Sequence, residues 1–205
     1  MQFVLKLDPP RDIKLESLMG IGTTYLYLSM WNDARKFYQM AAAADPNDAE
    51  SYYGIGLVDW EQCYKVRQAA RDRLGIRYSA RLSSKKPEQK KVCDELRAEN
   101  SSVVEEGITN LANAIKLRPD SSDAMAYLNL MYRERVDLDC DDAAAQIRDL
   151  KTADEWVDKT LATMKARADK PASASESNSG QRFRLTIPGP PPPPPPPPPT
   201  APSPR

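Results

Sequence analysis

The sequence offers few side chains that could perform acid–base or metal chemistry. It contains no histidine among its 205 residues, and histidine is both the commonest general base and the commonest metal ligand in proteins. Serine and aspartate are plentiful, but there is no Gly-x-Ser-x-Gly elbow and no histidine to activate a hydroxyl nucleophile. We therefore predict that the protein is not an enzyme and that it holds no cofactor.

Three cysteines remain as candidate nucleophiles or metal ligands. Cys63, Cys93 and Cys140 are few and widely scattered, and such a set indicates neither a disulfide framework nor a zinc site. Each lies in a helical or acidic context without a partner that would activate its thiol. We expect all three to be buried as small apolar side chains.

An acidic run resembles the beginning of a calcium-binding loop. The run consists of Asp137, Asp139, Asp141 and Asp142, and its first three members have the required spacing. An EF-hand with this start would need Gly at position 142 and Glu at position 148. The sequence has Asp142 and Arg148 instead. Aspartates are also favoured at a helix N-terminus, where the helix dipole stabilises negative charge. We predict helix capping here and no metal.

Composition divides the chain into two parts. Residues 1–168 contain every Trp and Tyr and nearly all the aliphatic residues, whereas residues 169–205 are rich in Ser and Pro and include ten consecutive prolines at 190–199. The second part has too few apolar groups to offset its ordering entropy, and we predict that it is disordered. The proline run is either a stiff spacer or a ligand for an aromatic groove.

Charge and hydropathy exclude two classes of partner. The net charge is zero, without the clustered excess of Lys and Arg typical of nucleic-acid binders. No stretch approaches the roughly 20 apolar residues of a membrane span, and the first residues lack the features of a signal peptide. We expect neither nucleic acid nor a membrane span. The location stays open: cytoplasmic by default, or exported to the periplasm if the true N-terminus lies upstream of Met1.

Internal repeats predict the fold. The segments LKLDPP (5–10), AAADPN (42–47) and IKLRPD (115–120) each end an apolar helical stretch with a proline that cannot continue the helix. Ahead of the second segment the spacing A-x3-aromatic-x2-A is preceded by further apolar and small residues. The residues of this pattern are Leu18, Ile21, Gly22, Tyr25, Ala34, Tyr38 and Ala41. The small ones allow two antiparallel helices to approach closely, and the large ones fill the space around them.

This pattern resembles the signature of the tetratricopeptide-repeat (TPR) family, with Leu18 in place of the usual Trp. The resemblance covers residues 1–168, and the expanded later repeats are similar to those of bacterial TPR proteins. It implies an all-α fold, an α-solenoid of about three antiparallel helix hairpins with a concave groove. A disordered Pro-rich tail follows it.

The repeat boundaries follow from the prolines. Residues 1–10 are interpreted as the end of a truncated preceding repeat, 15–48 as repeat 1, 49–120 as repeat 2 and 121–168 as repeat 3. One TPR takes about 34 residues, so repeat 2 has about 39 residues too many. We place them in an extended hairpin with helices at 49–74 and 88–117; a degenerate extra repeat is the less favoured alternative. In repeat 3 the second helix is expected to start near residue 142, with its inward face formed by Leu150, Ala153, Val157, Leu161 and Met164.

The resemblance also implies where a partner binds. In this family the first helix of each pair lines the groove, on the face opposite its packing residues. Carried over, this geometry selects a partly apolar set: Met19, Thr23, Tyr27, Tyr53, Leu57, Trp60, Ala126, Leu130 and Arg133. Exposed apolar patches mark interaction sites. The alternative is that the extended hairpin of repeat 2 packs over Leu57 and Trp60.

Two functions are compatible with this interpretation of the sequence. The first is a protein–protein interaction scaffold or adaptor that binds a partner peptide or protein along the groove. The second is a structural or assembly subunit of a bacterial envelope or secretion complex, with the proline tail as a tether. In solution we expect a monomer or weak self-association.

Overall fold

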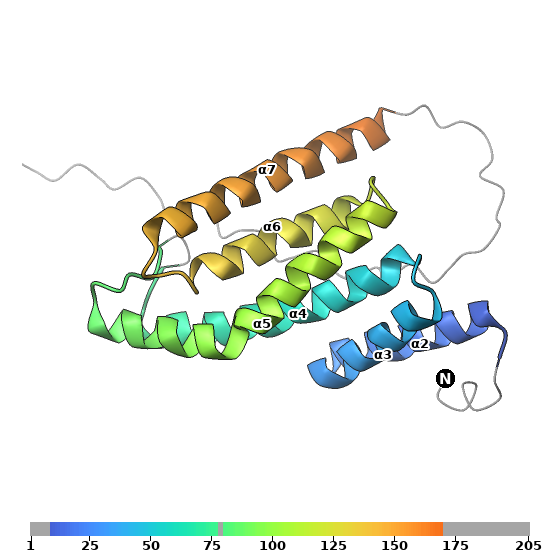
Figure 1. The fold of residues 1–205 in the computed structure, drawn as a ribbon, viewed down its shortest axis with the longest axis horizontal. Helices are drawn as coiled ribbons and strands as arrows, with labels where there is room; N and C mark the ends of the chain where they lie inside the picture. Colours follow the sequence, from blue (N-terminus) through green and yellow to red (C-terminus); the bar gives the residue numbers. More distant parts are fainter. Residues whose placement is uncertain (1–8, 78–79, 170–205) are drawn as a thin grey trace, which may run out of the picture.

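The computed structural model describes residues 9–77 and 80–169. Within them it contains six α-helices and no strand (Figure 1), which confirms the all-α prediction. The predicted truncated repeat at 1–10, apart from its last two residues, and the predicted disordered tail, apart from residue 169, lie outside the described residues.

The helix boundaries follow the predicted pattern. The helices are α2 (Arg11–Tyr27), α3 (Trp31–Ala44), α4 (Ala49–Arg73), α5 (Pro87–Leu117), α6 (Ser122–Val136) and α7 (Ala143–Ala168). The helices expected at 49–74 and 88–117 are α4 and α5, so the extra residues of the second pair do lengthen its two helices. No described helix is long and apolar enough to cross a membrane.

Side-chain caps start three of the helices. Asp48 Oδ2 accepts a hydrogen bond from the Ser51 amide at 2.9 Å, and Ser121 Oγ accepts one from the Ala124 amide at 3.4 Å. Asp142 Oδ1 accepts from the Ala145 amide at 2.9 Å. These bonds satisfy amides that have no partner within the first helical turn. The capping role predicted for the acidic run is therefore confirmed at Asp142.

The helices pack mainly in chain order. Each one contacts the next, and α4 also contacts α2 and α6. Among the described helices, α7 packs only against α6, and Figure 1 shows it at the edge of the molecule. The principal core joins α2 through α6, with the α6–α7 loop against it.

Close packing of the first pair depends on the predicted small residues. Ala34, Tyr38 and Ala41 are completely buried. A Cβ added to Gly22 would lie only 3.2 Å from the Tyr38 ring, which is tighter than ordinary van der Waals contact. The second pair repeats this relationship, because a Cβ on Gly56, 34 residues after Gly22, would overlap the Leu111 side chain.

Buried ion pairs join α4 to the end of α6, a feature that residue types and spacing did not predict. Arg67 Nε donates to Glu134 Oε2 at 2.6 Å, and Arg71 donates to Asp137 Oδ2 at 2.6 Å. All four side chains are less than a tenth exposed. Asp137 therefore belongs to this cluster and not to the helix cap predicted for the acidic run. Desolvated pairs of this kind are weak evidence for added stability, but losing one partner strands a buried charge.

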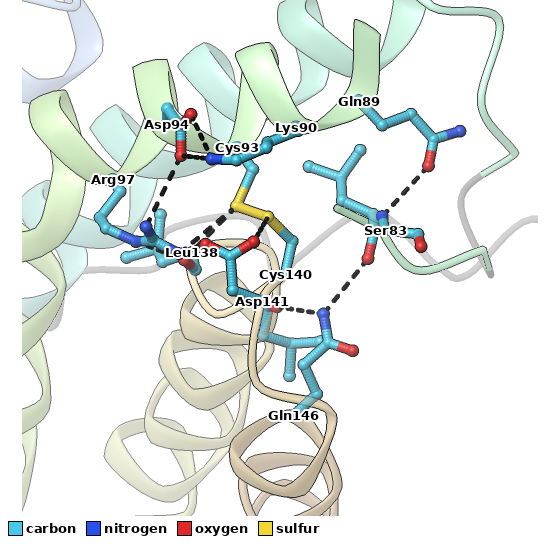
Figure 2. The surroundings of a disulfide bond; sticks show 12 residues. Ser83, Gln89, Lys90, Cys93, Asp94, Arg97, Leu138, Cys140, Asp141 and Gln146 are labelled. Atoms are coloured by element: carbon cyan, nitrogen blue, oxygen red, sulfur yellow. Dashed lines mark hydrogen bonds and ion pairs between the residues drawn. A yellow bond between two sulfur atoms is a disulfide. The ribbon is translucent and has the colours of Figure 1, made fainter. Parts of the chain in front are cut away.

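All three cysteines are buried, as predicted, but the expectation that the set forms no disulfide is wrong. Cys93 of α5 and Cys140 of the α6–α7 loop form a disulfide with an S–S distance of 2.02 Å (Figure 2). Arg97 Nε also binds the Leu138 carbonyl at 2.9 Å, which holds the loop against α5. Folding brings together two residues 47 positions apart, and spacing alone could not reveal this contact. Cys63 is a buried free thiol, as predicted.

The predicted inward face of α7 is also partly wrong. Ala153 is fully buried as expected, but Leu161 and Met164 are more than half exposed. The buried positions of α7 are instead Gln146, Asp149, Ala153 and Thr160. Because α6 is the only described helix that contacts α7, several large apolar residues of α7 stay exposed.

Candidate partner-binding site

The predicted groove residues of α4 do not form an open surface. Tyr53, Leu57 and Trp60 are 7%, 0% and 3% exposed, and all three belong to the main hydrophobic core. The expectation that they are exposed is therefore wrong.

Tyr127 of α6 contributes to this burial. Its ring meets the Trp60 ring edge-on at 5.1 Å between centroids and the Tyr53 ring edge-on at 5.8 Å. Tyr64, one turn after Trp60, stacks on the indole at 5.1 Å. The neighbouring first helix, carrying Tyr127, thus packs against Trp60. This cover differs from the extended hairpin of repeat 2, which the sequence indicated as the alternative to an open groove.

Thr23 of the predicted groove also has a structural role. Its hydroxyl donates to the Met19 carbonyl at 2.9 Å, so its oxygen can accept the proton of the Tyr38 hydroxyl 3.0 Å away. Thr23 is buried, and Met19 is half-buried against both core clusters. Together these bonds satisfy the phenol of Tyr38 inside the first helix pair.

The groove residues of α6 are half-buried. Ala126 and Leu130 are intermediate in exposure, and Leu130 packs against the core. Arg133 donates to Asp154 of α7 at 2.7 Å and to Asn129 within its own helix at 3.1 Å. This arginine therefore ties α6 to α7, which leaves it poorly placed to bind a partner.

Tyr27 is the one predicted groove residue that is largely exposed. It lies at the end of α2 and is 62% exposed, as is Leu28, and Met30 is 44% exposed. We call Tyr27, Leu28 and Met30 the turn patch. Three large apolar side chains within four residues of one turn are unusual on a surface where polar residues are expected. The structure does not bring this patch together with the buried α4 residues.

The backbone of this turn is strained and lies beside a hollow. Ser29 has a φ of 56°, in the left-handed region that a non-glycine residue adopts at a cost of order 1 kcal/mol. A hollow of about 290 Å³ is lined by Met30, Trp31 and Gln62 among others. The sequence YLSMW at 27–31 carries a signal for this site, since a turn with four large apolar residues and no Gly, Pro, Asn or Asp is atypical.

A buried carboxylate lies between the first and second helix pairs. Asp59 of α4 is completely buried, and Arg35 of α3 donates to its Oδ1 at 2.7 Å. Arg35 also donates to Gln62 at 2.9 Å, next to the hollow. Burial raises the pKa of the Asp59 carboxyl to about 6, even though the charge of Arg35 lowers it. The other oxygen, Oδ2, has no hydrogen-bond partner among the described residues.

The described residues form neither a metal site nor a reactive thiol. In the described part of the chain, no group of three or more Cys, Asp or Glu side chains could hold a metal ion. Burial raises the pKa of the Cys63 thiol, which disfavours the reactive thiolate. No protein-family model matches the chain, and no curated protein matches it in sequence.

Proposed function

We propose that this protein is a TPR-like α-solenoid that acts as an interaction scaffold, binding a partner protein or peptide. The repeated Gly22–Tyr38 and Gly56–Leu111 contacts support the repeat interpretation. The order of helix packing supports it too, because each second helix contacts the first helix of the next pair.

The observation that carries the binding proposal is the exposure of the turn patch. Tyr27, Leu28 and Met30 present apolar surface to solvent on a strained turn next to a hollow. Aromatic and large aliphatic anchors beside a pocket dominate many protein interfaces. Of the aromatic residues predicted to line the groove, Tyr53 and Trp60 are buried, so Tyr27 is the one whose ring is exposed enough to serve as this anchor.

Affinity capture followed by quantitative binding tests this function. The full chain is used as bait in an extract of its source cells, beside a Tyr27→Ala/Leu28→Ala variant. Met40→Ala is the control, because Met40 is a similarly exposed apolar residue on α3. The captured protein is then purified, and its dissociation constant should rise at least about tenfold for the double variant only. Equal binding by all three proteins would exclude the turn patch as the site.

The disulfide favours a second candidate, an assembly subunit of an envelope or secretion complex. Disulfides persist mainly in oxidising compartments such as the periplasm and are rare in the cytosol. The Cys93–Cys140 bond is buried and joins two separate elements, as structural disulfides do. Fractionation of the source cells, combined with a thiol-alkylation assay of the cysteines, distinguishes this candidate from a cytosolic scaffold. Reduced cysteines and a cytosolic protein would reject this candidate.

A further inference from the structure

Helix α7 carries two parallel stripes of residues. The inward stripe meets α6 and consists of Gln146, Asp149, Ala153, Trp156, Thr160 and Thr163. The outward stripe begins one residue later and consists of Ile147, Leu150, Asp154, Val157, Leu161 and Met164. A shift of one residue rotates a helix position by about 100°. The outward stripe therefore points to one side of α6, whereas the inward stripe points directly at α6.

The outward stripe is the more apolar of the two. Five of its six residues are large and aliphatic, whereas most of the inward stripe is polar or small. Ile147 and Leu161 are each 59% exposed, and Met164 is 54% exposed. The last helix of a helical stack normally has a polar outer face that keeps the stack soluble. In α7 the face opposite α6 carries exposed charged residues such as Lys151, Glu155 and Asp158. The apolar stripe lies between that polar face and α6, and α6 is the only described helix that α7 contacts.

The spacing of the outward stripe is that of a helix–helix seam. Its members alternate at intervals of three and four residues over nearly three heptads, as the a and d positions of a coiled coil do. The single acidic member, Asp154, is already paired with Arg133 at 2.7 Å. The seam therefore presents aliphatic side chains and one neutralised carboxylate to whatever covers it.

We propose that this seam is a self-association surface, on which α7 of a second copy packs antiparallel. An antiparallel pair centred between residues 155 and 156 places Ile147 opposite Met164 of the second copy and Leu150 opposite Leu161. Asp154 then faces Val157. Every layer but the central two contains only aliphatic side chains.

Charge complementarity selects this partner and this direction. Lys151 and Asp158 are both exposed and occupy equivalent positions on one edge of the seam, seven residues apart. In the antiparallel register Lys151 lies beside Asp158 of the second copy, and the symmetry of the dimer repeats the pair. In a parallel pair Lys151 and Asp158 would instead lie beside Gln146 and Ala153, neither of which is charged.

Measurement of the molar mass of the full chain tests the proposal. We expect a concentration-dependent dimer by sedimentation equilibrium. Leu161→Glu should raise its dissociation constant at least about tenfold while leaving the circular dichroism and melting of the monomer unchanged, because Leu161 is largely exposed. Met40→Glu makes the same change on α3 and should have no effect. If the full-length chain is monomeric, the self-association proposal is wrong, and a helix of another protein becomes the candidate that covers the seam.

Exchanging the charges at positions 151 and 158 tests whether the two α7 helices pack antiparallel. Lys151→Glu and Asp158→Lys should each weaken the homodimer, since each places like charges together. A mixture of the two variants should form a heterodimer, because both of its edge pairs are then complementary. Absence of a preference for the heterodimer would overturn the antiparallel register. Neither substitution touches the turn patch, so binding at Tyr27 and Leu28 should survive in all these variants.

Discussion

The ring of Tyr38 lies against Gly54 of the following helix pair so closely that a Cβ on this glycine would be 2.5 Å from Tyr38 Cδ1. The same ring contacts Gly22 of its own pair. One aromatic side chain therefore fills the space between α2, α3 and α4. Its hydroxyl is satisfied by Thr23 at 3.0 Å.

This contact predicts a steric cost for alanine at position 54. Gly54→Ala should lower the free energy of unfolding by about 1–3 kcal/mol, because the rigid ring cannot move out of a filled core. Gly22→Ala is the matched control and should cost less, since its Cβ would be 3.2 Å from the ring. Urea denaturation followed by circular dichroism measures both. If Gly54→Ala instead stabilised the protein by the roughly 1 kcal/mol expected from helix propensity alone, the contact would be wrong.

Trp60 is predicted to stabilise the core and not to bind a partner directly. Trp60→Ala should cost about 3–5 kcal/mol of unfolding free energy, as large-to-small changes at buried aromatic positions do. Tyr27→Ala should change stability by less than about 0.5 kcal/mol, because Tyr27 is mostly exposed. Thermal and urea melts of the two variants give the comparison. If both substitutions changed the unfolding free energy equally little, Trp60 would not be a core residue.

Asp59 predicts a defined pH dependence. Its pKa is about 6 in the folded protein, against 3.8 for an ordinary aspartate. A raised folded-state pKa contributes stability that is complete below the unfolded pKa and is lost as the pH rises through the folded one. The unfolding free energy of the wild type minus that of Asp59→Asn should therefore fall by about 2 kcal/mol between pH 4 and pH 6.5.

Other titrating groups cancel in that difference. Arg35 pairs with a carboxylate at position 59 only in the wild type. Denaturation of both proteins at several pH values makes the measurement. A difference that stays level, or that rises with pH, would contradict the raised pKa of the buried Asp59 carboxyl.

The disulfide should make stability depend on reductant. Replacing Cys93 and Cys140 together by Ser should cost about 2–4 kcal/mol, because the bond closes a loop of 47 residues in the unfolded chain. Dithiothreitol should lower the melting temperature of the wild type and of Cys63→Ala, but not that of the double variant. Three reactive thiols in the denatured, unreduced protein would show that the bond does not form.

The sequence by itself determined the helices and the first packing contact. Prolines and small residues at fixed spacing act over a few turns, so the ends of α4 and α5 and the match of Gly22 with Tyr38 could be predicted from local rules. The all-α class was implied by the resemblance of this pattern to the TPR signature.

Only the tertiary structure decided which helix faces meet. Several apolar stripes fit a helical repeat equally well, and the one that is buried depends on the neighbour that covers it. Tyr127 packs against Trp60, whereas nothing in the described structure covers Leu161. Likewise, the Cys93–Cys140 bond joins residues that are distant in sequence. Such contacts depend on how the helices are placed in three dimensions, which residue spacing along one chain does not specify.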